Sequence, residues 1–143
     1  MRRARLNSLS SRHPVADFLS KLGRKRYNKG IRTELKVFNI LRNHGFVVFR
    51  HPHSATPDLL AWRRGVLYLI EVKSTSKSVL IVDPEQLRVL TGMLDFYQHT
   101  TIPALAFIVV YFSEYGDFGS RRINPLDRWV MVRYGDHADE IPF

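Results

Sequence analysis

One stretch of this chain limits its possible folds more than any other. Residues 56–73 predict a β-hairpin, because residues 59–62 and 66–72 are apolar runs rich in branched and aromatic side chains. Arg64-Gly65 between the runs suits a two-residue turn, in which glycine tolerates the positive backbone angles required. A turn at these two residues sets the register of the whole hairpin, and with it the relative positions of the charged residues at its open end.

In that register Asp58 lies opposite Glu71, with Cβ atoms roughly 4.5–5.5 Å apart, and Lys73 shares their face of the sheet. Two facing carboxylates are unfavourable unless a cation lies between them. Mg²⁺ takes oxygen ligands, and a metal-bound water is a nucleophile for phosphodiesters, which Lys73 would orient. The alternatives are a surface hairpin with solvated charges, or a one-residue slip that puts Asp58 and Glu71 on opposite faces.

The positive charge is concentrated near the N-terminus. The chain of 143 residues has a net charge of +9, and residues 1–29 contain nine Lys and Arg against one acidic residue, Asp17. A basic arm favours nucleic acid as the partner, then a membrane surface. The alternative is a solubilising tail. Spacing of Val15, Phe18, Leu19 and Leu22 after Pro14 predicts a short helix inside this arm.

The remaining pattern predicts one mixed α/β domain, with a sheet flanked by helices, over residues 29–143, and an N-terminal arm over residues 1–28. Expected helices cover 31–44, with Ile31, Leu35, Phe38 and Leu41 inward, and 84–98, capped by Asp83. Expected strands besides the hairpin cover 46–50, 79–82, 104–112 and 128–134. Residues 74–78 and 113–124 are expected as loops, and residues 135–143 as an acidic tail.

Several protein classes are excluded or disfavoured by composition. No apolar run reaches the roughly 18 residues of a membrane span, and the basic N-terminus lacks the apolar core of a secretory signal. The absence of cysteine excludes disulfides and thiolate metal sites, and it is consistent with an intracellular protein. His51 and His53 alternate in a loop. Without a third nearby ligand they indicate phosphate proximity or solvation rather than a zinc site.

These motifs together resemble the archaeal Holliday junction resolvases of the PD-(D/E)XK nuclease superfamily. Pro57-Asp58 followed by Glu71-Val72-Lys73 matches the short superfamily signature. More specific similarity lies in the 29–34 segment before the first helix, in Ser54, and in the helix that contains Gln86. The resemblance spans about residues 29–134. It implies a restriction-endonuclease-like fold and a homodimer.

The resemblance also implies a role for individual residues. Asp58, Glu71 and the Val72 carbonyl would bind Mg²⁺, with Mn²⁺ able to substitute. Lys73 would position the attacking water, and Ser54 would act at the scissile phosphate. Glu34, which by its helix position alone is expected to be solvated, would complete the acidic cluster. The residues expected to contact DNA are Arg24, Lys25, Arg26, Lys29, Arg32, Arg50, His53 and Lys77.

The resulting hypothesis is a Mg²⁺-dependent endonuclease that nicks opposing strands of four-way DNA junctions. A related nuclease acting on flaps, single strands or foreign DNA would use the same catalytic residues. A third hypothesis is a DNA-binding module without catalysis that uses the basic arm alone.

Overall fold

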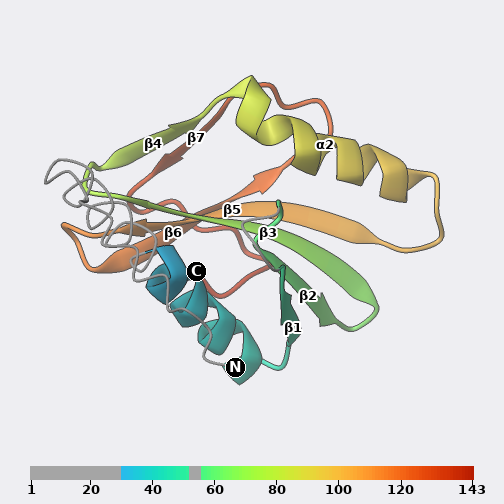
Figure 1. The fold of residues 1–143 in the computed structure, drawn as a ribbon, viewed down its shortest axis with the longest axis horizontal. Coiled ribbons are helices and arrows are strands. Elements are labelled where there is room, and N and C mark those ends of the chain that lie inside the picture. Colours follow the sequence, from blue (N-terminus) through green and yellow to red (C-terminus); the bar gives the residue numbers. More distant parts are fainter. Residues whose placement is uncertain (1–29, 52–55) are drawn as a thin grey trace, which may run out of the picture.

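The central feature is a five-stranded sheet with strand order β1-β2-β3-β5-β6, and a second sheet pairs β4 with β7 (Figure 1). The computed structural model describes residues 30–51 and 56–143. Its strands are β1 (Val47–Arg50), β2 (Leu59–Arg63), β3 (Val66–Thr75), β4 (Val79–Val82), β5 (Ala104–Phe112), β6 (Asp117–Ile123) and β7 (Val130–Arg133). Helix α2 spans Pro84–Gln98, and residues 30–43 are also helical. β3 and β5 are parallel, and the other pairs are antiparallel.

The predicted hairpin is confirmed, including its turn and register. Arg63 pairs with Val66, and Leu59 pairs with Ile70. Arg64 and Gly65 both have positive φ, at 52° and 79°, as a two-residue hairpin turn requires. Asp58 and Glu71 therefore follow the last ladder pair as opposed residues.

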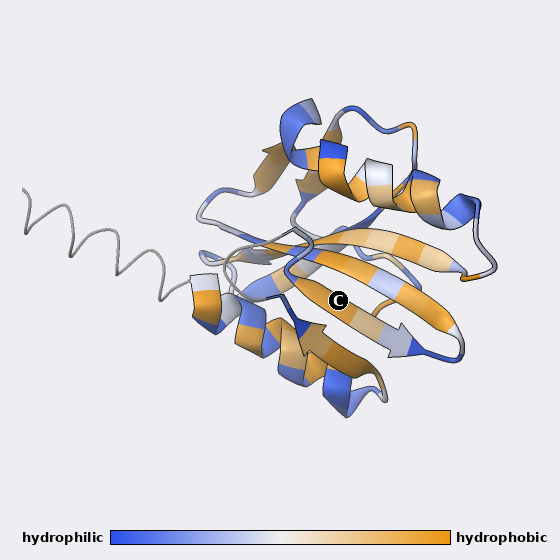
Figure 2. Cartoon of the chain, turned by 45° about the vertical axis from the view of Figure 1, so that its right-hand side comes forward, coloured by the Kyte–Doolittle hydropathy of each residue, from blue (hydrophilic) through white to orange (hydrophobic). Residues whose placement is uncertain are grey.

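The large sheet is covered on both faces. The helix of residues 30–43 packs on one face, where Tyr68, Ile70 and Val72 of β3 join Leu41 in one buried cluster. α2 and the β4–β7 sheet cover the other face, where Leu69 is buried. Figure 2 shows hydrophobic residues along the strands and hydrophilic residues on the outer sides of the helices. β3 is thus buried on both faces, so it is a rigid support for the charged residues at its end.

Predicted boundaries agree best where local signals are strong. β4, α2 and β5 have the predicted bounds, and Asp83 caps α2 by accepting a hydrogen bond from the Gln86 amide at 2.8 Å. β1 and β7 are shorter than predicted, and the helix predicted for residues 31–44 ends at residue 43. Within the described residues, no helix is long and apolar enough to span a membrane.

The inward face predicted for the first helix is partly wrong. Leu35 is 38% exposed, whereas Thr33, Val37 and Leu41 are buried. Apolar residues occur on more than one side of this helix, so periodicity alone does not select the side that packs on the sheet.

Two predicted loops and the predicted tail are corrected by long-range pairing. Residues 113–124 contain strand β6, whose polar side chains are tolerated because it is an edge strand of the five-stranded sheet. β3 extends through Thr75 because β5 continues to pair with it as far as Phe112. The C-terminal residues Ile141 and Phe143 are buried in the core, so the end of the chain is not a free acidic tail.

Candidate active site

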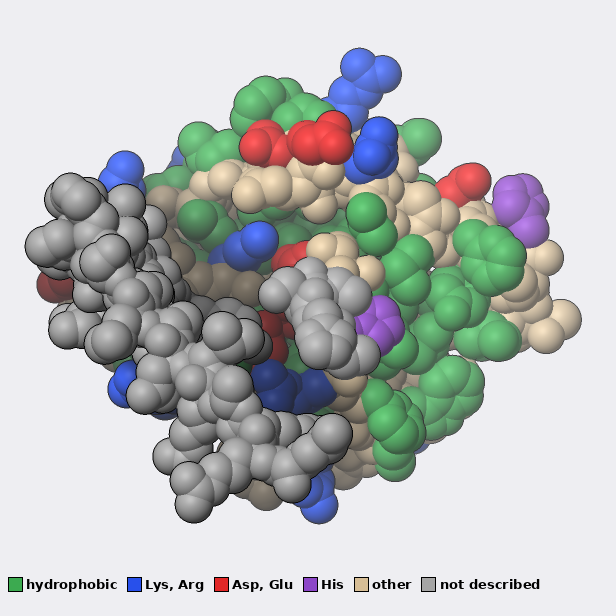
Figure 3. Space-filling model, viewed as in Figure 1, with side chains coloured by type: hydrophobic (Ala, Val, Ile, Leu, Met, Phe, Trp, Pro, Cys, Tyr) green, Lys and Arg blue, Asp and Glu red, His purple; other side chains and the backbone are tan. Residues whose placement is uncertain are grey.

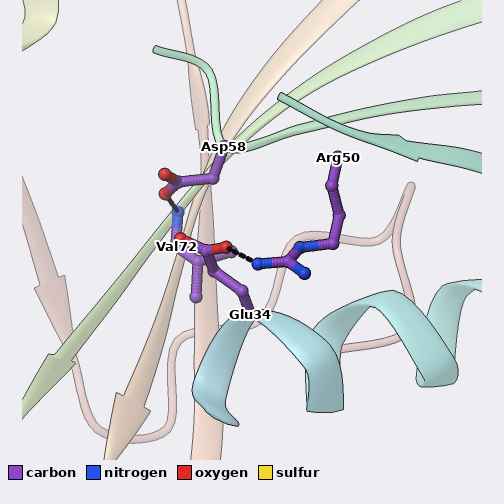
Figure 4. Close-up of polar contacts among 4 residues, drawn as sticks. All are labelled: Glu34, Arg50, Asp58 and Val72. Carbon is purple, nitrogen blue, oxygen red and sulfur yellow. Dashed lines mark hydrogen bonds and ion pairs between the residues drawn. The ribbon is translucent and has the colours of Figure 1, made fainter. Parts of the chain in front are cut away.

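The site is built around Asp58, which lies where β2 begins to diverge from β3. The Oδ2 atom of Asp58 accepts a hydrogen bond from the Val72 amide at 2.8 Å (Figure 4). The backbone carbonyl of Asp58 accepts a second bond from the His51 amide at 3.0 Å, which ties this residue to the end of β1. Asp58 is therefore held from both neighbouring strands, and its carboxylate reaches the Glu71–Val72 level of β3.

Glu71 and Lys73 lie on the same strand and share one cavity with Asp58. Glu71 is only 6% exposed, and Lys73 is half-buried. The cavity has a volume of about 250 Å³. It is lined by Gly30, Thr33, Glu34, Thr56, Asp58, Glu71, Val72, Lys73 and Ser74. The structure thus brings together the two carboxylates and the lysine that the hairpin register predicted.

The carboxyl group of Asp58 has a strongly altered proton affinity. Burial is the main cause that raises its pKa from 3.8 to about 7, followed by a hydrogen bond with Glu71 and the charge of Glu71. The Val72 amide and the charge of Lys73 act in the opposite direction. In the absence of a cation, the Asp58 carboxyl group therefore keeps its proton up to about neutral pH.

Glu34 approaches the same cavity from the first turns of the helix of residues 30–43. Burial, then the charge of Asp58, raises the pKa of Glu34, while Arg50 lowers it. Arg50 Nη2 lies 3.1 Å from Glu34 Oε2, as Figure 4 shows. The expectation that Glu34 is an ordinary solvated residue is wrong, because it lies in the electrostatic field of Asp58. Glu34 lines the same cavity as Asp58 and Glu71.

The donor set suits a hydrated hard cation better than a closed metal site. Within residues 30–51 and 56–143, no group of three or more His, Asp or Glu is arranged to hold a metal ion. Mg²⁺ needs only one or two protein carboxylates, since it keeps several waters. Two crowded carboxyl groups, one with a raised pKa, meet this need, and a cation would relieve their repulsion. His51 is not among the residues that line the cavity.

The predicted DNA-contact residues are only partly described. Arg32 is exposed, and Lys77 is exposed in the turn between β3 and β4. The guanidinium of Arg50 is engaged by Glu34. Arg24, Lys25, Arg26, Lys29, His53 and Ser54 lie outside the described residues, as does the predicted short helix of the arm.

Sequence reasoning missed Thr33, Thr56 and Ser74, which also line the cavity. The Ser74 hydroxyl is buried, and it has no hydrogen-bond partner among residues 30–51 and 56–143. Its position directly after Lys73 is the only signal in the sequence that placed it near the site. Thr33 directly precedes Glu34 in the sequence, but packing of the helix against the sheet brings it to the cavity.

Comparison with known proteins supports this arrangement. The family model described as archaeal Holliday junction resolvase (Hjc) matches residues 25–117, which include the hairpin and the residues of the cavity. The chain belongs to the archaeal Holliday junction resolvase family. The matched stretch also includes α2 and β5, so family membership covers both helical layers of the fold.

Individual relatives share between 18% and 36% sequence identity with this chain. A crossover junction endodeoxyribonuclease of Sulfolobus islandicus rod-shaped virus 1 is 36% identical over 87 residues, which are 57% of this chain and 70% of that protein. The crossover junction endodeoxyribonuclease Hjc of Methanocaldococcus jannaschii is 30% identical over 74 residues, 52% of this chain and 56% of that protein. The structure of Archaeoglobus fulgidus Hjc is similar in fold, with a TM-score of 0.57 and 18% identity, over 75% of this chain and 85% of that one.

Proposed function

We propose that this protein is a Mg²⁺-dependent endodeoxyribonuclease that resolves four-way DNA junctions by paired nicks. The observation that carries the proposal is the shared cavity in which Asp58 and Glu71 meet beside Lys73. Membership of the resolvase family supports the substrate class. Two curated relatives are named as crossover junction endodeoxyribonucleases.

Each residue of the cavity has a distinct part in this proposal. Asp58 and Glu71 would hold Mg²⁺, or Mn²⁺ in its place, together with the Val72 carbonyl. When bound, the ion supplies Lewis-acid activation of water and of the phosphodiester. The Lys73 ammonium orients the attacking water by donating a hydrogen bond, and its charge offsets part of the carboxylate charge.

Glu34 and Arg50 act on the same cavity from its outer side. Glu34 lines the cavity and would add a third acidic side chain to the ion site. The Arg50 guanidinium holds Glu34 in place at 3.1 Å and partly neutralises it. With 37% of its side chain exposed, Arg50 also presents donors toward an approaching DNA backbone. Ser54 would complete the site at the scissile phosphate.

Binding would rest on phosphate contacts spread over the domain and the arm. Arg32 and Lys77 are exposed on the domain, which we propose to span residues 29–143. Arg24, Lys25, Arg26 and Lys29 would extend the positive surface from the arm of residues 1–28, and His53 would lie near a phosphate. Contacts of this kind position DNA without reading its sequence. A DNA substrate of this type implies an intracellular place of action.

A two-fold homodimer would set two active sites against the two-fold symmetry of a junction. The support for an interface is an exposed apolar surface on β1 and β2. Val47, Phe49 and Trp62 are 56%, 61% and 40% exposed, and Val47 lies opposite Trp62. Figure 3 shows hydrophobic side chains gathered on the right of that view, over the β2–β3 side of the sheet. Such surfaces mark interaction sites in soluble proteins.

The test is Mg²⁺-dependent cleavage of a panel containing a mobile four-way junction, a flap, a duplex and a single strand. We expect the junction to be cut in preference, with symmetric products. Glu71→Gln should bind the junction and cut none of the substrates, because binding depends on phosphate contacts elsewhere. Preferred cleavage of flaps or single strands would refute the junction assignment. A wild-type protein that binds but never cuts would refute the enzyme assignment.

A further inference from the structure

Two half-exposed tyrosines, Tyr115 and Tyr134, stack on each other at the end of the sheet where β3 and β5 finish, which is also the end that carries the catalytic cavity. The ring centroids of Tyr115 and Tyr134 are 4.1 Å apart, and the ring planes differ by 14°. Their exposed fractions are 49% and 45%, so about half of each side chain is accessible to a ligand. Among the described residues, the aromatic ring contact of Tyr115 is with Tyr134.

The backbone and the core hold both rings in place. The Tyr115 amide donates to the Phe112 carbonyl at 3.0 Å in the β5–β6 turn. The Tyr134 amide donates to the Ser78 carbonyl at 2.8 Å, at the end of β7. Buried Phe112 supports Tyr134 from below, edge to face, with a centroid distance of 6.0 Å. A ligand stacking on Tyr115 would therefore meet a surface that loses little conformational freedom on binding.

Strand register places Phe112, which contacts both tyrosines, on the same face of the sheet as Lys73. Phe112 pairs with Thr75, which lies two residues beyond Lys73 on β3. Alternation puts Lys73 and Thr75 on one face, and two residues along a strand span about 7 Å. The Ser113 amide donates to the Thr75 carbonyl at 2.9 Å, which joins the turn that contains Tyr115 to the catalytic strand.

A basic residue lies on the turn that joins the catalytic strand to Tyr134. Lys77 is exposed in the β3–β4 turn, where its amide donates to Thr75 Oγ1 at 3.1 Å. The carbonyl of its neighbour Ser78 accepts the hydrogen bond from the Tyr134 amide, so the Lys77 backbone lies between the catalytic strand and the Tyr134 backbone. Half-exposed stacked rings with a lysine on the adjoining turn, on a chain with a net charge of +9, are the chemistry that binds a nucleic-acid base and its phosphate.

We propose that Tyr115 and Tyr134 form a stacking platform for an unpaired DNA base next to the scissile phosphate, with Lys77 on the adjoining phosphate. The proposal rests on the proposed nuclease function for its substrate class. The stacking platform adds to the proposed nuclease function a base-binding surface that selects open or distorted DNA over intact duplex. Tyr134 lies outside residues 25–117, which the resolvase family model matches, so the family comparison does not assign this surface.

The test is the affinity of the full-length Tyr115→Ala variant, in EDTA, for three labelled DNAs of related sequence. We expect binding to a single strand and to a four-way junction to weaken about tenfold, in the range for removal of one stacked base. Duplex affinity should stay the same. Tyr115→Phe should bind like wild type, since stacking needs the ring and not the hydroxyl. A 2-aminopurine at the branch should be quenched by wild type and by Tyr115→Phe only.

The matched control is Phe96→Ala, which removes an exposed ring of the Phe96–Tyr97 pair near the C-terminal end of α2. It should leave all three affinities unchanged. Equal losses on single strand and duplex, a loss with Tyr115→Phe, or wild-type binding by Tyr115→Ala would each overturn the platform. Junction cleavage by wild type is scored separately. Selective loss of single-strand binding without any junction cleavage would uphold the platform and refute the resolvase assignment.

Discussion

Replacing Asp58 with asparagine should stabilise the metal-free protein while abolishing its cleavage activity. The structure holds the Asp58 carboxyl group beside Glu71 in a buried cavity, where burial and the neighbouring acid disfavour its charged form. An asparagine retains an oxygen that accepts the hydrogen bond from the Val72 amide, as Asp58 does at 2.8 Å. Its amide group then donates to Glu71 in place of a repulsive contact. The substitution also removes the charge with which we propose that Asp58 holds Mg²⁺.

The size of the effect follows from the pKa of Asp58. A rise from 3.8 to about 7 is equivalent to at most about 4 kcal/mol at alkaline pH. Because Asp58 is partly exposed and coupled to Glu71, we expect about 1–2 kcal/mol in the free energy of unfolding. For a domain of this size that corresponds to an increase in Tm of about 4–8 °C.

The pH dependence has a definite sign. Since folding raises the pKa of Asp58, the stability contributed by its neutral form is complete below about pH 4 and is lost as the pH rises to about 7. The difference in Tm between Asp58→Asn and wild type should therefore grow across this interval and then level off. Thermal unfolding by circular dichroism in EDTA, from about pH 4 to pH 8, measures it.

The control variant is Asp95→Asn, which neutralises an exposed carboxylate on α2 and should show no such growth. Adding Mg²⁺ should stabilise wild type and leave Asp58→Asn unchanged, because ligands that bind only the folded state raise its stability. The reasoning is refuted if Asp58→Asn is less stable than wild type at alkaline pH in EDTA, or if the difference does not change with pH.

Three further predictions test other parts of the structure. Lys73→Met should slow junction cleavage by about 10²-fold while junction affinity changes little. Single-turnover cleavage and fluorescence anisotropy measure the two quantities, and an equal loss in affinity would contradict a role of Lys73 in orienting water. Phe143→Ala should lower the free energy of unfolding in urea by about 3 kcal/mol, because the Phe143 side chain is only 8% exposed and packs on Phe118. An unchanged urea midpoint would show that Phe143 does not contribute to the core. Deleting residues 1–28 should reduce the dependence of log affinity on log salt by about 0.9 for each DNA phosphate that the arm neutralises; an unchanged slope would assign the arm a role other than DNA binding.

The sequence by itself determined the local parts of this protein. The Arg64-Gly65 turn sets the hairpin register, because both residues take positive φ and the pairing follows from the turn. That register brings Asp58 toward Glu71. The bounds of α2 follow in the same way from the Asp83 cap and the leucine spacing. In each case the deciding interactions join residues close in the chain, so they can be read from its order.

Only the tertiary structure decided what depends on distant segments. Glu34 lies near Asp58 because the helix of residues 30–43 packs across the sheet, and no local pattern specifies which side of that helix faces inward. β6 is a strand because the backbone of β5 has groups on its outer side that need hydrogen-bond partners, although the sequence of β6 is largely polar. Tyr115 and Tyr134 stack because each directly follows the end of a strand, β5 or β7, and the two strand ends lie next to each other. Packing between elements distant in sequence decides these positions, and the chain's periodicity does not encode it.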